Sequence, residues 1–101
     1  MRWTMIEIEK LEVEGKPLLG LRVEMPGTPP MLLILGERGF IMCGYLNIEV
    51  AERLGAAAAV VTGVNTFEDV LNAEIKAATS KGESLGLKPG KIVREVIGGI
   101  T

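Results

Sequence analysis

Residues 40–61 read FIMCGYLNIEVAERLGAAAAVV, and this stretch decides the fold. It opens with an apolar strand pattern. Asn47 is then a good N-cap for a helix over 48–54, and Gly55 is a good stop for it. The small apolar residues 56–61 form a short buried strand. A strand, a helix and a strand in succession predict a right-handed crossover, which makes the two strands parallel.

Two half-polar strands precede this unit. Residues 5–9 alternate apolar and acidic side chains and residues 11–14 alternate again, but the phase slips at Lys10. The slip predicts either a β-bulge or one strand that bends onto a new face. A turn at 15–17 leads to a second strand over 19–25, whose odd-numbered positions are all apolar.

The sequence PGTPP at 26–30 is the clearest loop of the chain. Residues 31–35 and 40–43 are apolar on both faces, which is typical of central strands covered on both sides. The sequence GERG at 36–39 predicts the hairpin turn that joins them.

Three more helices are predicted after residue 61. Residues 66–69 (TFED) resemble a capping box and start a helix that runs to about Ala78. A short helix over 80–85 and a last one over about 89–97 follow, each ended by glycine. The order β-β-β-β-α-β-α-α-α predicts an α+β fold of one domain, residues 1–101. Its N-terminal antiparallel strands join one mixed sheet, with the helices packed on one face.

Composition excludes several kinds of site. The 101 residues include no histidine and one cysteine, Cys43, and the net charge is −2. A Ser-His-Asp triad, a Cys-His dyad and a His-based zinc site are therefore excluded, and no metal or cofactor is predicted. No intrachain disulfide can form, and the lone thiol fits a reducing cytoplasm.

Partners are restricted in the same way. No Lys/Arg cluster stands out, and one Trp, one Tyr and two Phe offer few stacking platforms, which disfavours nucleic-acid binding. The longest apolar run, residues 56–61, is far below the ~20 residues of a membrane helix, and the N-terminus lacks a signal-peptide core. The absence of Gln and the dominance of Glu over Asp give a thermophile-like composition.

Two strand-to-helix turns carry the candidate site: Cys43-Gly44-Tyr45-Leu46-Asn47 and Gly63-Val64-Asn65-Thr66. If their strands are parallel, both turns lie at the carboxyl end of the sheet, where open α/β sheets bind ligands. Each turn also opens a helix, whose free N–H groups favour anions. The candidate ligand-binding residues for a small anion or metabolite are Gly44, Tyr45, Asn47, Gly63, Asn65 and Thr66. The alternative is that these residue types serve only the tight turns.

Cys43 supports a second hypothesis. A thiol at a helix N-terminus ionises more readily, which makes it a better nucleophile. The alternative is a buried cysteine that behaves as a small hydrophobe at the end of an apolar strand. Two functions follow: a binding or accessory protein without chemistry, or a small enzyme with Cys43 as its catalytic nucleophile.

Residues 39–47 (GFIMCGYLN) resemble the YunC-like family of small bacterial and archaeal proteins. The sequences at 59–64, 66–69 and 85–87 extend the resemblance, which covers about 18–97. The resemblance implies an N-terminal β-sheet region that mediates tetramerisation. It implies no established activity, so no catalytic residue is carried over.

The N-terminal strands, residues 1–25, are the predicted oligomerisation region. Apolar residues fall on both faces of these strands, one core covers only one face, and exposed strand edges readily pair with another chain. We therefore expect a homo-oligomer, with Leu11 and Val13 as candidate interface residues, and the resemblance sets the number of subunits at four. The alternative is a monomer whose bent first strand covers its own second face.

Overall fold

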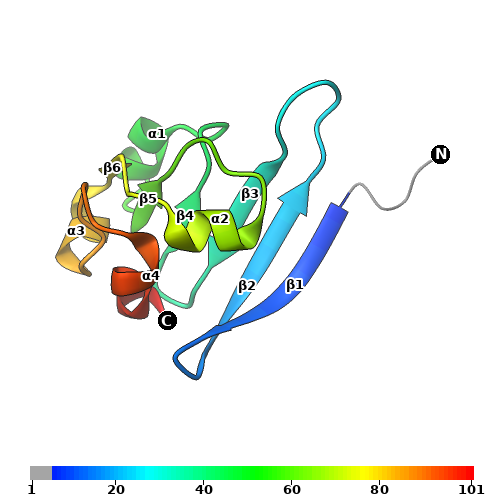
Figure 1. The fold of residues 1–101 in the computed structure, drawn as a ribbon. Coiled ribbons are helices and arrows are strands. Elements are labelled where there is room, and N and C mark those ends of the chain that lie inside the picture. The colour runs from blue at the N-terminus through cyan, green and yellow to red at the C-terminus, as the bar shows by residue number, and fades with distance from the viewer. Residues whose placement is uncertain (1–5) are drawn as a thin grey trace.

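The computed structural model describes residues 6–101 as one six-stranded sheet with helices on both sides (Figure 1). The elements in chain order are β1 (Ile6–Val13), β2 (Lys16–Val23), β3 (Met31–Leu35), β4 (Phe40–Met42), α1 (Ile48–Arg53), β5 (Ala58–Val60), α2 (Phe67–Asn72), β6 (Ala77–Ala78), α3 (Ser80–Ser84), α4 (Val93–Val96) and a 3₁₀ helix (Ile97–Ile100). The strands lie in sequence order, and only β4 and β5 are parallel. The predicted α+β class and mixed sheet are confirmed.

The first two strands form a long hairpin without a bulge. Their register is continuous from the pair Ile6–Val23 to the pair Val13–Lys16. The phase slip at Lys10 is therefore a change in which face carries the apolar side chains. Before Lys10 they lie on one face of the sheet, and after it they lie on the other.

The two faces of this hairpin have different environments. Leu11 and Val13 belong to the core face and pack with the main hydrophobic cluster. On the opposite face, called here the outer face, Ile6 and Ile8 are 60% and 67% exposed. By strand alternation the outer face also carries Leu19, Leu21 and Val23 of β2. Leu11 and Val13 were expected in a subunit interface, but they face the core, which buries Val13 and partly buries Leu11.

The helices were expected on one face of the sheet, and this detail is wrong for α1. α2, α4 and the 3₁₀ helix cover the core face, where Ile41 and Ala59 lie. α1 packs through Ala51 on the opposite face, against Met42 and Ala58. The central strands are apolar on both faces and need cover on both, and the crossover helix can cover only one of them.

The predicted helix over 67–78 ends early, because α2 stops at Asn72. Glu74 then forms an antiparallel bridge with Ile92, and the chain continues extended into β6, which the sequence did not predict. Ile75 would fit the apolar stripe of a longer helix. In the structure it lies on the extended segment after α2, and its side chain is still buried in the core, at 1% exposed. The long-range bridge replaces the last helical turns.

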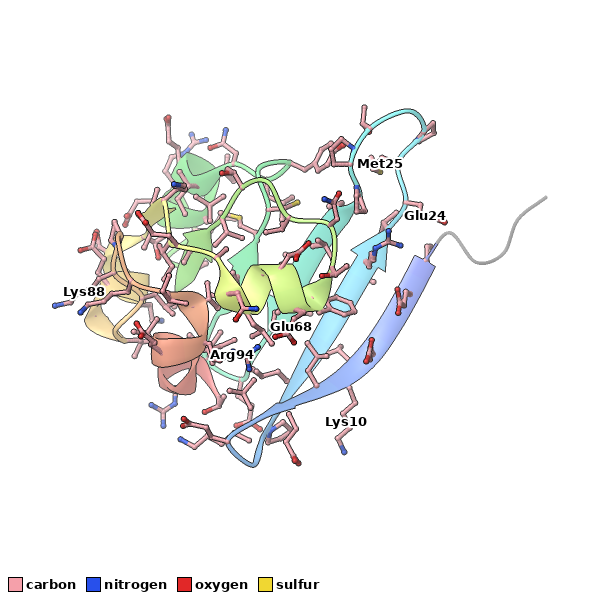
Figure 2. All side chains as sticks on the ribbon, viewed as in Figure 1. Lys10, Glu24, Met25, Glu68, Lys88 and Arg94 are labelled. Atoms are coloured by element: carbon pink, nitrogen blue, oxygen red, sulfur yellow. The ribbon has the colours of Figure 1, made fainter. Side chains whose placement is uncertain are left out.

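The last helix also begins later than predicted. α4 starts at Val93, so Pro89 lies outside it, and Gly98 and Gly99 lie within the 3₁₀ helix rather than ending the segment. Ile92 pairs with Glu74 in the antiparallel bridge, so its backbone is extended and the helix begins only at the next residue. The salt bridge between Glu68 and Arg94, which Figure 2 labels, joins α2 to α4. In the described part of the chain no helix has the length and hydropathy needed to cross a membrane.

Thr79 links β5 to the helix that follows β6. Its side chain is almost fully buried, and its Oγ1 accepts hydrogen bonds from the N–H groups of Ala58 (3.0 Å) and Gly82 (3.0 Å). The same hydroxyl donates to the carbonyl of Ala56 (2.7 Å). One side chain therefore satisfies two buried backbone N–H groups and one partly buried carbonyl, and such groups are costly to leave unpaired.

We expect Thr79→Val to lower the free energy of unfolding by about 2–3 kcal/mol, because the isosteric side chain leaves these backbone groups without partners. Urea denaturation followed by circular dichroism measures the change. Thr79→Ser keeps the hydroxyl and should cost about 1 kcal/mol, the value of one buried methyl. The matched control is Thr62→Val on the exposed turn after β5, expected within about 0.5 kcal/mol of wild type. Equal stability of the two valine variants would contradict the role of Thr79.

Candidate functional site

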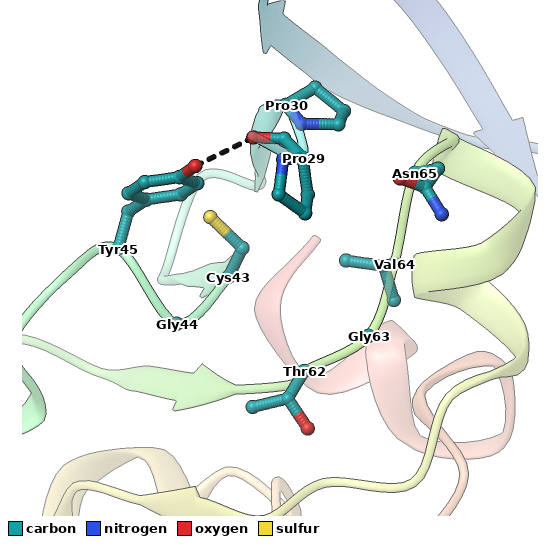
Figure 3. Close-up of a pocket in the computed structure, with 9 residues that line it drawn as sticks. All are labelled: Pro29, Pro30, Cys43, Gly44, Tyr45, Thr62, Gly63, Val64 and Asn65. Atoms are coloured by element: carbon teal, nitrogen blue, oxygen red, sulfur yellow. Dashed lines mark hydrogen bonds between the residues drawn. The ribbon is translucent and has the colours of Figure 1, made fainter. Parts of the chain in front are cut away.

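A pocket lies at the carboxyl ends of β4 and β5, the parallel pair (Figure 3). Its volume is about 370 Å³, within the range of small-molecule sites. Three segments line it: the end of the loop between β2 and β3, the turn after β4 and the turn after β5. The lining residues are Pro29, Pro30, Cys43, Gly44, Tyr45, Thr62, Gly63, Val64 and Asn65.

The turn after β4 is shaped by the cap of α1. The Asn47 side-chain oxygen accepts hydrogen bonds from the N–H groups of Glu49 (2.8 Å) and Val50 (3.4 Å). The N–H of Leu46 donates to the carbonyl of Cys43 (3.3 Å), which closes the turn. Asn47 therefore fixes the turn but does not line the pocket, because its amide is used at the helix.

The turn after β5 is fixed from both sides. Thr66 caps α2, since its Oγ1 accepts from the N–H of Asp69 (3.0 Å), and the Asp69 carboxylate accepts from the N–H of Asn65 (3.1 Å). On the other side, Arg22 of β2 donates from Nε to the carbonyl of Asn65 (3.1 Å). Both backbone groups of Asn65 are thus used, and its side chain remains at the pocket wall.

Cys43 lies at the inner end of the pocket. It is 4% exposed, and its sulfur accepts a hydrogen bond from the N–H of Leu32 (3.3 Å) at the start of β3. Figure 3 shows the sulfur directed toward the space between Tyr45 and Pro29. The thiol therefore belongs both to the hydrophobic core and to the pocket wall.

Tyr45 joins two of the lining segments. Its phenol carries one proton, which it donates to the carbonyl of Pro29 (2.7 Å), while the Thr28 hydroxyl lies 2.8 Å away and can donate to the phenol oxygen. Tyr45 is 45% exposed, so it forms the outer wall of the pocket rather than part of the core.

Gly44 and Gly63 both line the pocket, but only one of them is required to be glycine by the backbone. Gly63 has φ +71°, a left-handed conformation that other residues adopt only with strain. Gly44 has no positive φ, and a Cβ built there would meet only Thr62 Cγ2, at an ordinary 3.7 Å. Conformation accounts for Gly63, but neither conformation nor packing requires glycine at position 44.

The predicted site residues are largely brought together. Five of the seven line the pocket: Cys43, Gly44, Tyr45, Gly63 and Asn65. Asn47 and Thr66 are helix caps outside the lining. The lining residues that the sequence did not single out are Pro29, Pro30, Thr62 and Val64. Thr62 and Val64 adjoin a predicted residue, but the two prolines reach the site from a distant loop.

The pocket lining offers few side chains that could act as a general acid or base. Among the described residues, its lining includes no carboxylate and no Lys or Arg side chain, and Cys43 and Tyr45 are the only titratable groups. Within residues 6–101, no three His, Cys, Asp or Glu side chains are placed to hold a metal ion. The arrangement can enclose a small molecule between apolar walls and offer it backbone and amide hydrogen bonds.

Sequence and structure comparisons give relatives of unknown function. A family model described as a domain of unknown function, DUF1805, matches residues 42–99. The uncharacterized protein YunC of Bacillus subtilis is 30% identical over 97 residues, which cover 92% of this chain and 95% of YunC. The crystal structure of a protein of unknown function, TA1206 from Thermoplasma acidophilum, has a TM-score of 0.92 at 34% identity. That match covers 100% of this chain and 98% of TA1206.

We expect iodoacetamide to alkylate Cys43 on the order of 100-fold more slowly in the native protein than in urea-unfolded chain, because the thiol reacts only when the structure opens locally. Mass spectrometry gives the rate without ambiguity, since the chain has one cysteine. Glutathione, alkylated under both conditions, corrects for the effect of urea. A native rate close to that of glutathione would contradict the burial of the thiol.

Proposed function

Because the chain belongs to the DUF1805 family, whose function is unknown, we propose a function from the pocket itself. The protein binds a small, uncharged metabolite at the carboxyl ends of β4 and β5. Pro29 and Val64 supply apolar walls, and Asn65 supplies an amide that can orient the ligand.

The observation that carries this proposal is the free space at Gly44. A Cβ built at this position meets no backbone within 4 Å, and its nearest neighbour is Thr62 Cγ2, at 3.7 Å. The absence of a side chain leaves part of the pocket open, and a ligand can approach the backbone there. The fold alone does not require an open space at this turn, so the space is better explained by a bound ligand.

The charges around the pocket favour an uncharged ligand over the small anion that the sequence suggested. The first N–H groups of both neighbouring helices are already capped, by Asn47 and Thr66. Beside the lining, the Asp69 carboxylate and the Arg22 guanidinium both bond to the backbone of Asn65, so their opposite charges offset each other. Among the described residues, no cationic side chain lines the pocket to bind an anion directly.

The alternative function is a small enzyme that uses Cys43 as its nucleophile. One observation favours it: the sulfur lines the pocket and is directed into it (Figure 3). Two observations weigh against it, since the thiol is nearly buried and the lining has no side chain suited to act as a base. Binding without chemistry is therefore the function that we propose.

We also propose that the protein acts in the cytoplasm as a homo-oligomer, a tetramer by family resemblance, assembled through the outer face of β1 and β2. Ile6, Ile8 and Leu19 expose large apolar side chains on that face, and such patches are typical of interaction sites. β1 is also at the edge of the sheet formed by the described strands, and edge strands readily pair with another chain. The single free thiol is consistent with a reducing compartment.

We expect a metabolite library to contain compounds that raise the melting temperature of the wild-type protein. At a concentration of 100 times Kd, binding adds about 2.7 kcal/mol to the free energy of unfolding. In a domain of this size that corresponds to a shift on the order of 10 °C. Gly44→Leu fills the free space and should abolish the shift without loss of fold. Differential scanning fluorimetry measures both effects.

Gly98→Leu is the matched control, because Gly98 also lacks positive φ and a Cβ there would meet only Lys16 Nζ, at 3.8 Å. This variant should keep the shift. Hits that survive Gly44→Leu bind elsewhere and would contradict the proposed site. Inorganic phosphate, the probe for an anion site, should give no shift.

Assembly has its own test. We expect Ile8→Glu to shift the mass measured by light scattering toward that of the 10.8 kDa monomer, because it introduces charge into the proposed interface. Glu9→Lys changes the charge on the core-side face of the same strand and should leave the mass unchanged. A wild-type mass near 10.8 kDa at micromolar concentration would refute the oligomer, whatever the variants show.

A further inference from the structure

The loop between β2 and β3, residues 24–30, is held to the rest of the protein at few points. It projects beyond the end of the sheet (Figure 1), and Figure 2 labels its first residues, Glu24 and Met25. Its one internal backbone hydrogen bond runs from the N–H of Thr28 to the carbonyl of Met25, at 3.4 Å. Three of its seven residues are prolines, which have no N–H to donate.

Tyr45 supplies the hydrogen bonds that tie this loop to the pocket. Within residues 6–101, the two bonds of its phenol, with Thr28 and the Pro29 carbonyl, are the only hydrogen bonds that join loop residues 24–30 to other segments. The loop in turn places Pro29 and Pro30 in the pocket wall. The hydrogen bonds that hold that wall therefore come from one exposed tyrosine.

We propose that the β2–β3 loop is a movable gate of the pocket and that the Tyr45 phenol is its latch. Breaking the two hydrogen bonds releases Pro29 and Pro30 from the wall, which widens the pocket and uncovers the thiol of Cys43. Re-forming them closes the wall over a bound molecule. Tyr45 is thus a positioning residue: it acts on the ligand through the loop. The purpose of the gate rests on the proposed binding function, but the experiment that tests the gate needs no ligand.

The chemistry of the latch suits reversible opening. The phenol is partly exposed, so water can replace each protein partner, and a hydrogen bond exchanged for one to water contributes little net free energy. The prolines restrict the conformations of the loop itself, so it moves about its two ends rather than collapsing into the pocket. No strong interaction has to be broken for a ligand to enter.

Cys43 provides a reporter of gate opening that requires no known ligand. Its sulfur bonds to the N–H of Leu32, two residues after the loop ends, and it is almost unexposed while the gate is closed. We expect Tyr45→Phe, which keeps the ring and removes the hydroxyl, to raise the native alkylation rate by iodoacetamide about tenfold. Thr28→Val removes one of the two bonds and should give a smaller rise.

Two controls separate gate opening from general loosening. Ser84→Ala removes a surface hydroxyl bond to the Lys81 carbonyl, far from the loop in sequence, and should leave the alkylation rate unchanged. Hydrogen exchange at the N–H of Val61, which bonds to the Met42 carbonyl in the core, should be the same in Tyr45→Phe as in wild type.

The outcomes are distinct. A faster alkylation with unchanged exchange at Val61 supports the gate. A wild-type alkylation rate in Tyr45→Phe overturns it, and so does a parallel rise in exchange at Val61, which would mean that the core opens as a whole. If the gate is supported but no compound shifts the melting temperature, the binding function fails while the gate stands.

Discussion

The parallel pairing of β4 with β5 is the constraint on which the site depends. Parallel strands cannot be joined by a tight turn, so the chain between them must cross over, and here it does so through α1. The crossover brings the carboxyl ends of both strands to the same edge, and with them the turns that contain Gly44 and Gly63. Antiparallel pairing of the same strands would place the two turns at opposite ends of the sheet.

Local signals made this part of the fold predictable. The cap at Asn47 and the apolar runs around it act over a few residues, so the sequence alone indicates the crossover. Long-range pairing explains what was missed. The end of α2 at Asn72 depends on the bridge between Glu74 and Ile92, and Ile75 fits the core equally well from a helix or from extended chain. Alternation likewise indicates that β1 changes its apolar face, but not which face the core takes.

The clustering of the candidate site residues was predictable to the same extent and for the same reason. Cys43 and Gly44 follow the end of β4, and Asn65 lies in the turn between β5 and α2. The topology places them together once the crossover is recognised. Pro29 and Pro30 come from a loop that hydrogen-bonds to the Tyr45 phenol. Its partners, Pro29 and Thr28, lie 16 and 17 positions before Tyr45 in the sequence, and no local pattern encodes a contact over that separation. Asn47 and Thr66 show the converse, because the residue types that mark a ligand turn are also those that cap helices.

The loop that walls the pocket begins one residue after Val23, and Val23 lies on the outer face. A neighbouring subunit seated on that face would hold one anchor of the loop in place. Assembly and ligand binding would then be coupled reciprocally. By whatever factor assembly changes the affinity of the pocket for the proposed ligand, the ligand changes the association constant of the subunits by the same factor. If the proposed binding and assembly both hold, the ligand would act through β2 to change the fraction of the protein that is assembled at a given concentration.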